Sequence, residues 1–532
     1  MKKLLALLLA VIMIFALVAC VQTEGDGDGE GDGALTEEQK YGGHLNISSI
    51  NINGRLDPSN VGGVYHWPNL IWESPLSRNE DGSIAPGVCN FELSEDQLTL
   101  KLWVREGITF HDGNPVTIDD VVASMLRRGH KSPTQFVVDY LAEEPTVKDG
   151  VATFKFKKYS EKTMYYIASV KTLHAVLPKW FCEKYPGTTA DGVVNNLDIV
   201  DAIGTGPYKA DSERDGEWLK LVRYEGYVKG DASLTGGAAP KNAYFDSITF
   251  WNQSDATASA IQLLAHDLDV MSATLDEYKP QFALNNLAQT QQMGTKTQFL
   301  LFNNMNQENQ VHADANLRKA ICAALDFEEI NTEMWASNYD LTGTPAQDSA
   351  YYVDTFNKAD YMGKANVELA KEYLKKSNYK GEKIYFVSTN ANMAALIESY
   401  LKPAGINLDI QIKESESELE KGTNNWNFTF WPFTAAGSPT TVSANAYDRA
   451  WVSEEKTRLY NILATTIPGS AEYMQAWKDM AQVWVDECVT VYVGQQYATW
   501  THHEDLVVNY KNADIYIWNW YWKNPAEHQL KG

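Results

Sequence analysis

Residues 98–128 read LTLKLWVREGITFHDGNPVTIDDVVASMLRR, and they set the local fold of this part of the chain. Apolar side chains alternate along 98–104, and a period of two predicts a half-buried strand. Thr117 predicts the N-cap of a helix that runs from Ile118 to Arg128. Asp120 stands three places after Thr117, so the two residues predict a capping box.

Strand patterns recur on both sides of this stretch. Alternating apolar residues predict strands at 151–157, 218–224 and 245–251. A β-α-β unit is predicted from strand 383–388, helix 391–402 and strand 406–412, with Gly405 at the end of the helix. The chain is therefore expected to be mixed α/β.

Further helices are predicted from apolar residues at helical spacing. They cover about 313–325, 454–466 and 471–487. Asp255 predicts the N-cap of another helix. The expected apolar face of that helix consists of Ala258, Ile261, Leu264 and Leu268.

The composition is that of an acidic globular protein with more than one core. The chain has 532 residues, with 69 acidic against 45 basic side chains and a net charge of −24. A single hydrophobic core stops growing beyond about 250–300 residues, so two or three lobes are expected. The negative charge argues against a nucleic-acid partner, because phosphate contacts need a basic surface.

Five cysteines are present, and none forms a CxxC pair. Cys89, Cys182, Cys322 and Cys488 lie far apart in the sequence, so zinc and thioredoxin-like sites are not supported. Disulfides and buried free thiols both remain open for these four.

Residues 1–19 predict a lipoprotein signal peptide. Two lysines precede the apolar run 4–19, which is shorter than the roughly 20 residues that a spanning helix needs. The run ends in Leu-Val-Ala-Cys, which resembles the bacterial lipobox, so Cys20 is the expected lipidation site. An ordinary signal peptide with a chance cysteine is the alternative. Residues 20–40 follow as an acidic, glycine-rich tether, and the mature chain is expected outside the cytoplasm, anchored to the cell membrane.

The stretch 98–128 resembles the signature of family 5 extracellular solute-binding proteins of ABC importers, the oligopeptide, dipeptide and nickel type. The shared positions are Arg105, Gly107, Phe110, Asp112, Gly113, Pro115, Asp120 and Val121. Two further segments, 204–208 (GTGPY) and 316–326 (NLRKAICAALD), are similar to family motifs in the same order. In a third, 266–270 (HDLDV), His266 stands where the family usually has glycine. The resemblance covers essentially residues 41–530.

Several motif residues are expected to shape the backbone rather than to contact a ligand. Asp112, Gly113 and Pro115 predict a turn, and Gly204 and Gly206 permit a tight backbone. The GTG sequence is not a phosphate loop, because no Lys-Ser/Thr pair follows it.

The resemblance implies a periplasmic-binding-protein-like fold of type II (cluster C), with two α/β lobes, a hinge and an extra subdomain. Lobe I is expected from 41–80, 205–300 and 500–532, the extra subdomain from 81–204, and lobe II from 301–499. Such a receptor closes over its ligand, and the ABC permease complex recognises the closed form. We expect a monomer that needs no cofactor or metal.

Relatives that bind peptides pair an acidic residue with the α-ammonium group of the peptide. The acid lies just after a tryptophan and before an acid-proline pair. The matching stretch 426–439 reads WNFTFWPFTAAGSP, in which Trp431 fits the tryptophan and Ser438-Pro439 replaces the acid-proline pair. No acid lies between them, Asn427 replaces a Tyr-Asp step upstream, and Asp448 is the next acid downstream. The charge that pairs with the amine is therefore missing or displaced.

Two ligand classes follow from this departure. Peptides would bind through backbone hydrogen bonds and an acid from elsewhere, and a neutral oligosaccharide would stack on aromatic faces; nickel or another ligand is a third possibility. Family frequency favours peptides. The candidate ligand-binding residues are Trp431, Phe433, Tyr65, His66 and Trp67, for each of which a packing role is also open.

A secreted lipoprotein hydrolase is the alternative from a different functional class. The sequence has no GxSxG elbow and no HExxH helix. Residues 502–505 read HHED and suggest a metal cluster, but adjacent histidines on a strand point to opposite faces. We therefore expect a binding protein and not an enzyme.

Overall fold

The computed structural model contains two compact units, Met1–Gln39 and Lys40–Gly532. It describes residues 35–49, 57–58, 67–127, 134–160, 163–164, 167–168, 174–186, 198–253, 255–272, 278–303, 309–335, 337–341, 351–356, 359–414, 425–434, 439–440, 442–443, 453–488, 490–508, 510–511 and 514–530. The predicted signal peptide, Cys20 and most of the tether lie outside the described residues. Within the described ranges, no helix combines the length and the apolar character that crossing a membrane requires.

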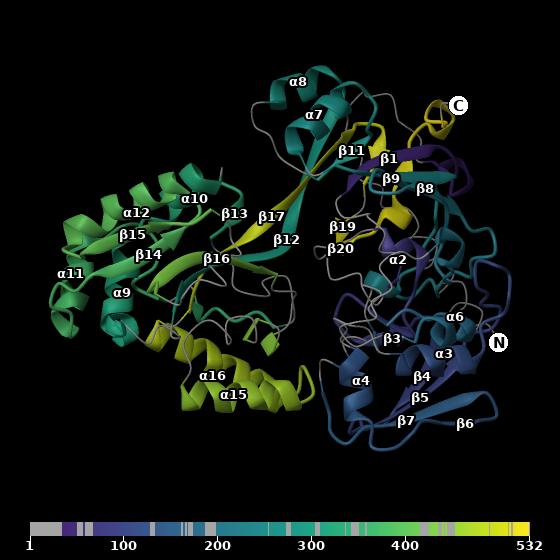
Figure 1. Ribbon diagram of the computed structural model, residues 1–532, viewed down its shortest axis with the longest axis horizontal. Helices are drawn as coiled ribbons and strands as arrows, with labels where there is room; N and C mark the ends of the chain where they lie inside the picture. Colours follow the sequence, from purple (N-terminus) through teal and green to yellow (C-terminus); the bar gives the residue numbers. More distant parts are fainter. Residues whose placement is uncertain are drawn as a thin grey trace, which may run out of the picture. The chain divides into compact units, whose positions relative to one another are not determined.

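An 11-stranded mixed sheet organises the unit Lys40–Gly532 (Figure 1). Its strands follow the order β15-β14-β16-β12-β17-β11-β1-β10-β9-β8, and β13 pairs with β17 beside this path. The bounds are β1 His44–Ser49, β8 Tyr208–Arg214, β9 Trp218–Arg223, β10 Ser247–Asn252, β11 Val270–Met271, β12 Leu287–Phe302, β13 Tyr339–Asp340, β14 Ile384–Ser388, β15 Leu408–Ile412, β16 Phe428–Thr434 and β17 Thr490–His503.

The two longest strands, β12 and β17, link the two ends of this sheet. They pair antiparallel from Leu287 opposite His503 to Leu301 opposite Thr490. The register shifts between Met293 and Thr297 and again at Gln298. Because β17 also pairs with β11 and β12 also pairs with β16, the ribbon carries the chain from one set of strands to the other (Figure 1).

The strands β1 and β8 to β10 pack on a core that is rich in tryptophan. Trp67, Trp72 and Trp500 are buried there, together with three tryptophans of the C-terminal segment 516–522. Trp67 and Trp72 flank the helix α2 (Pro68–Ile71), Trp500 lies in β17, and the other three lie in or beside the 3-10 helix η7 (Ile517–Asn519) and β21 (Tyr521–Trp522). Much of the tryptophan content of the chain therefore stabilises this core.

The predicted β-α-β unit is confirmed in β14, α12 (Ala391–Ala404) and β15. The two strands pair in parallel, and Asn390 caps the helix with its side chain. Gly405 ends the helix at φ 86°, a left-handed conformation that favours glycine. The helices α9 (Ala315–Ala324), α10 (Phe327–Trp335) and α11 (Val367–Lys376) complete this core, seen on the left of Figure 1.

The motif helix α9 buries the apolar face that its sequence predicts. Leu317, Ala320, Ile321 and Ala324 are all fully buried. Arg318 is buried as well, and its guanidinium donates to the carbonyls of His312, Ala313, Glu487 and Cys488. This motif arginine therefore ties the start of α9 to the end of α16.

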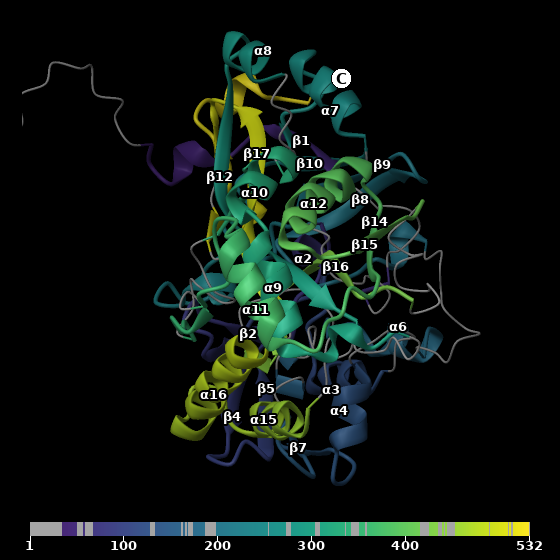
Figure 2. The same ribbon diagram turned by 90° about the vertical axis from the view of Figure 1, so that its left-hand side faces the viewer.

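The predicted helices near the end of the chain are α15 (Glu454–Thr465) and α16 (Ala471–Glu487). Ser453 and Ser470 cap them through side-chain oxygens. Their buried faces join Phe299, Val387 and Trp431 in a separate hydrophobic cluster. Figure 2 shows the two helices side by side below β12, β16 and β17.

A four-stranded antiparallel sheet forms around the signature segment. Its order is β4-β5-β7-β6, with bounds β4 Cys89–Leu93, β5 Thr99–Val104, β6 Thr146–Lys148 and β7 Val151–Lys155. Leu100 and Leu102 of β5 are fully buried, as the alternation predicts. The sheet has its own core, shared with α3 (Ile118–Leu126) and α4 (Thr134–Tyr140).

The capping box at the start of α3 is confirmed. The Thr117 hydroxyl accepts a hydrogen bond from the Asp120 backbone N–H, and the Asp120 carboxylate accepts one from the Thr117 N–H. The second oxygen of Asp120 accepts from Lys179 N at the start of α6 (Lys179–Lys184). One aspartate therefore positions the ends of two helices.

The backbone roles of the motif residues are also confirmed. Asp112 accepts a hydrogen bond from Asn114 N, and Gly113 has φ 83°, which forms the turn. A Cβ on Gly204 would lie 2.1 Å from the Ile71 oxygen, and one on Gly206 would lie 2.3 Å from the Leu70 oxygen. These glycines permit the backbone to pass directly against α2.

The predicted apolar face of the helix after Asp255 is confirmed at Leu268, which is buried, and wrong at Ile261. Asp255 does cap α7 (Ala256–Leu264), but Ile261 is 56% exposed. The buried residues are Ser259, Ala260 and Leu263. Apolar residues lie on several sides of this short helix, so its pattern fits more than one face, and packing against Leu268 and Phe282 selects Leu263.

The remaining described elements are short. They are η1 Glu38–Lys40, β2 Leu76–Arg78, β3 Ile84–Pro86, η2 Ile199–Asp201, η3 Gly236–Ala238, α8 Lys279–Leu284, η5 Val311–Ala313, β18 Leu506–Val507, β19 Tyr510–Lys511, β20 Asp514–Ile515 and η8 Pro525–Glu527.

Candidate ligand-binding site

Trp431 lies in β16, directly beside the long strand β12. It stands opposite Phe299 in the antiparallel register, and Phe299 in turn stands opposite Tyr492 of β17. Trp431 is 8% exposed and belongs to the cluster that includes Tyr473 and Trp477. Most of its ring therefore packs in the core, and only a small part of it is accessible to a ligand.

Phe433 follows in the same strand, where its backbone stands opposite Thr297. Its side chain lies outside the described residues, as do Ser438 and Asp448. The sequence has no acid between Trp431 and Pro439. The described part of β16 therefore offers aromatic and backbone groups, without a carboxylate for an amine.

Asn427 holds the start of β16 in place. Its side-chain oxygen accepts from Tyr385 N at 2.7 Å, and its amide nitrogen lies 2.7 Å from His312 Nδ1. Asn427 is fully buried. In this chain, the residue that replaces the Tyr-Asp step serves as a structural connection between β16, β14 and η5.

His312 completes this connection as a neutral ring. Its Nε2 donates to the Asn303 carbonyl at 2.7 Å, so Nδ1 is the acceptor for the Asn427 amide. Burial lowers the pKa of His312 to about 4. A proton on Nδ1 would place two donors against each other, so this geometry requires the uncharged form near neutral pH.

Trp67 lies in a different cluster from Trp431. It immediately precedes α2, is fully buried, and packs against Trp72 with ring centroids 6.0 Å apart. Tyr65 and His66 lie outside the described residues. The structure thus assigns Trp67 a packing role in the core around β1, and direct contact with a ligand would require its ring to become exposed.

Glu73 lies beside a small polar cavity near this core. Lys241 Nζ lies 2.6 Å from the Glu73 carboxylate, and the Tyr227 hydroxyl donates to it at 3.0 Å. The cavity has a volume of about 30 Å³, which is the room of a single water molecule. The Glu73 carboxylate is already paired with Lys241 and Tyr227, so this cavity is not a peptide site.

A wider hollow of about 870 Å³ lies on the small four-stranded sheet, where Trp103 and Lys101 of β5 and Lys148 of β6 line it. None of the candidate residues lies there. His528, which was not among the residues predicted from the sequence, joins His503 and Asp505 in a group of metal-ligand type. No signal near residue 528 indicated this, because the three residues come together only in the fold.

Comparison with known proteins identifies the family. The family described as "Bacterial extracellular solute-binding proteins, family 5 Middle" matches residues 83–457, and the chain belongs to it. This confirms the resemblance read from the signature segment. It also confirms the expectation of a solute-binding protein rather than an enzyme.

Two curated relatives show how far the sequence similarity extends. The oligopeptide-binding protein AppA of Bacillus subtilis is 26% identical over 356 residues, which is 62% of this chain and 61% of AppA. The chain thus matches less than two thirds of the length of AppA. The nickel-binding protein NikA of Staphylococcus aureus is 23% identical over 371 residues, 68% of each chain.

Solved structures confirm the predicted periplasmic-binding-protein-like fold. The ABC transporter substrate-binding protein CtaP of Listeria monocytogenes has a TM-score of 0.71 at 18% identity, covering 91% of this chain and 100% of CtaP. AppA, solved in complex with a nonapeptide, has a TM-score of 0.65 at 18% identity, covering 91% of this chain and 99% of AppA.

Proposed function

We propose that this protein is the extracytoplasmic receptor of an ABC importer and that its ligand is a peptide. The observation that carries the proposal is membership of family 5 together with similarity to AppA, an oligopeptide-binding protein whose solved structure holds a nonapeptide. The receptor captures peptides outside the cytoplasm and delivers them to the permease. A lipid on Cys20 anchors it to the membrane.

Capture works by closure of two lobes. Lobe I comprises 41–80, 205–300 and 500–532, lobe II comprises 301–499, and 81–204 form the extra subdomain. The strands β12 and β17 cross between the two lobes and act as the hinge, which their register shifts support. A ligand that touches both lobes only when they are closed stabilises the closed form.

The contact set that we propose is Trp431, Phe433, Tyr65, His66 and Trp67. Aromatic side chains offer a large contact area at low cost in conformational entropy, which suits a peptide of variable sequence. Trp431 contributes its exposed edge, since most of its ring is buried. Trp67 contributes only in a conformation that exposes its ring.

Peptide recognition here does not depend on an acid beside Trp431. Between Trp431 and Pro439 the chain has no Asp or Glu, and Asn427 is committed to structural hydrogen bonds. A buried ion pair between the peptide amine and an acidic side chain adds several kcal/mol to the binding free energy only when both partners are present. Acetylation of the peptide N-terminus therefore removes no ion pair with this stretch, and a loss of affinity on acetylation would indicate an acid from elsewhere in the chain.

A neutral oligosaccharide is the second candidate ligand. The observation that favours it is the same absence of an acid, next to Trp431 and Phe433. Sugars stack on aromatic rings and need no charged partner. This reading predicts binding of sugars and no binding of peptides, the reverse of our proposal.

A thermal-shift screen separates these readings. The purified chain is tested with di- to hexapeptides, the same peptides N-acetylated, α- and β-linked oligosaccharides, and nickel with free histidine. A ligand at 100 times its dissociation constant stabilises the folded state by about 2.7 kcal/mol. We expect stabilisation by both peptide sets, while stabilisation by sugars or by nickel-histidine alone would refute the peptide proposal.

The lipid anchor has its own test. Wild-type cells and cells producing Cys20→Ala are fractionated, and the mature N-terminus is analysed by mass spectrometry. A diacylglyceryl group on Cys20 and loss of the Cys20→Ala protein from the membrane fraction are expected. A wild-type protein cleaved elsewhere, without lipid, would refute the anchor.

A further inference from the structure

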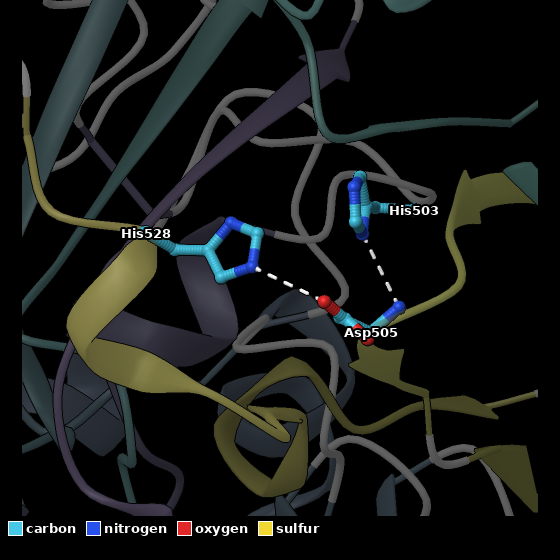
Figure 3. A group of neighbouring side chains, drawn as sticks. All are labelled: His503, Asp505 and His528. Atoms are coloured by element: carbon cyan, nitrogen blue, oxygen red, sulfur yellow. Dashed lines mark hydrogen bonds and ion pairs between the residues drawn. The ribbon is translucent and has the colours of Figure 1, made fainter. Parts of the chain in front are cut away.

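Three side chains of metal-ligand type meet at the end of β17 (Figure 3). His503 is the last residue of β17, Asp505 lies in the turn before β18, and His528 directly follows η8. One potential ligand atom of each lies within 4.8 Å of the others. The group therefore joins the C-terminal segment to the end of a central strand.

His528 is fixed with one nitrogen directed at the group. Its ring stacks on Trp522 with centroids 3.6 Å apart and an interplanar angle of 6°. Its Nε2 is buried and lies 3.9 Å from Asp505 Oδ2, beyond hydrogen-bond distance. In the tautomer protonated on Nδ1, this buried Nε2 has a lone pair available for a cation.

His503 is held on the other side of Asp505. Its Nδ1 accepts a hydrogen bond from Asp505 N at 3.2 Å, and its ring centroid lies 5.2 Å from that of His528 (Figure 3). Burial lowers the pKa of both histidines. Neutral imidazole is the form that binds metals.

The neighbouring His502 belongs to the opposite side of the strand. It is buried, its Nε2 lies 2.8 Å from the Thr290 hydroxyl, and its Nδ1 donates to the His503 carbonyl. The expectation that adjacent histidines point to opposite faces is thus confirmed. His528 from the C-terminal segment takes the place that His502 cannot fill.

Two imidazoles and a carboxylate are the ligands of zinc and related transition metals, whereas calcium and magnesium prefer oxygen alone. Zinc ligands lie about 2.0–2.2 Å from the ion, so neighbouring ligand atoms are about 3.3 Å apart. The distance from His528 Nε2 to Asp505 Oδ2 is 3.9 Å, so it must shorten by less than about one ångström for both atoms to bind the same zinc ion. The ligand atoms of the three residues lie within 4.8 Å of one another, so no separation among them must shorten by more than about 1.5 Å.

A further histidine lies at the edge of the group. The ring of His266 is 6.1 Å from that of His503, and His266 is exposed. Its φ of 57° is in the left-handed region, which favours glycine. His266 or a water molecule would supply the fourth ligand of a tetrahedral ion.

We infer that His503, Asp505 and His528 form a site for a divalent transition metal, with zinc preferred, that clamps the C-terminal segment to the end of β17. The site is far from Trp431 among the proposed ligand contacts, whereas Trp67 shares a buried cluster with Trp522, on which His528 stacks. Tyr492, in register with the Phe299–Trp431 pair, and His503 occupy opposite parts of β17, roughly 35 Å apart at about 3.3 Å per residue.

Titration calorimetry with zinc chloride tests the site. The full chain is purified without a histidine tag, stripped with a chelator and compared with Asp505→Asn and His528→Gln. The wild-type protein should bind one zinc ion per chain, and each substitution should weaken binding at least tenfold. Asp267→Asn, which changes an exposed acid beside His266, is the control and should leave the affinity unchanged.

Absence of zinc binding to the wild-type chain would overturn the proposal, as would undiminished binding in both variants or equal weakening by Asp267→Asn. Cobalt provides a readout that needs no variant. Cobalt bound to the wild-type chain should give the intense visible absorption of a four- or five-coordinate site with nitrogen ligands. The weak spectrum of hydrated cobalt would contradict the site.

Discussion

Arg127 and Asp57 form a buried, two-point ion pair. Arg127 Nη1 donates to Asp57 Oδ1 at 2.8 Å and Nη2 donates to Oδ2 at 2.6 Å, and both side chains are 2–3% exposed. Arg127 follows the signature helix α3, and Asp57 precedes Pro58 in the N-terminal part of the chain. The pair therefore fastens the signature segment to the rest of the unit.

Removing one partner should destabilise the protein strongly. Arg127→Met removes the guanidinium from the buried Asp57 carboxylate, and the expected loss is about 3–5 kcal/mol of unfolding free energy. Denaturant unfolding measures this loss. The exposed pair Lys101–Glu92 provides the control, because Lys101→Met should change the stability by less than about 1 kcal/mol. Equal effects of the two substitutions would contradict the role of burial.

The free energy of unfolding should fall as the pH is lowered from 6.5 to 4, because three buried histidines are neutral in the folded state. Burial lowers the pKa of His44, His111 and His312 to about 4, whereas an unfolded histidine titrates near 6.5. Above pH 6.5 both states are neutral and the stability is complete. Below pH 6.5 the unfolded chain takes up protons before the folded chain does. The free energy of unfolding therefore falls by about 2 kcal/mol per histidine between pH 7 and pH 5.

Unfolding free energies of the wild type and of His312→Gln at pH 7 and pH 5 measure this contribution. The variant should lose about 2 kcal/mol less than the wild type over this interval, because it lacks one of the three groups. An identical pH dependence would show that His312 is not held neutral.

Trp431 should affect affinity, whereas its neighbour Trp477 should affect only stability. Both belong to one cluster, but Trp477 is fully buried and donates to the Tyr351 carbonyl. Because Trp431→Ala would open a large cavity, Trp431→Phe is the better probe. It should weaken peptide binding several-fold in calorimetry, and Trp477→Phe should not. Unchanged affinity in Trp431→Phe would remove Trp431 from the contact set.

Cys322 and Cys488 should form a disulfide under oxidising conditions. Their sulfur atoms are 3.6 Å apart in the buried core between α9 and the end of α16. A disulfide needs about 2.05 Å, a small approach for two adjacent side chains. Peptide mapping after refolding with an oxidised glutathione buffer should find this bond, while Cys89 and Cys182 stay reduced. In the Cys20→Ala chain, which keeps four of the five cysteines, four titratable thiols after oxidation would contradict the prediction.

Local sequence rules predicted the elements whose signals lie within a few residues. The strand at 99–104, the capping box of Thr117 and the left-handed Gly405 all depend on neighbouring residues, and the structure contains each. The end of α3 differs slightly from the prediction. The helix stops at Leu126 instead of Arg128, where the Arg127 side chain pairs with Asp57.

Features that depend on distant residues were not predictable in this way. Ile261 is exposed because the segments that follow α7 pack against another side of this helix. Trp67 is buried because it packs in the core around β1. The group of His503, Asp505 and His528 depends on where the C-terminal segment folds back. These contacts belong to the tertiary structure, which no local period encodes.

Small-angle X-ray scattering tests the closure mechanism most directly. The purified Cys20→Ala chain is measured alone and with a saturating concentration of a peptide that stabilises it in the thermal-shift screen. If the lobes close over the peptide, the radius of gyration falls on binding and returns when the peptide is removed. A bound peptide that leaves the radius of gyration unchanged would contradict the account.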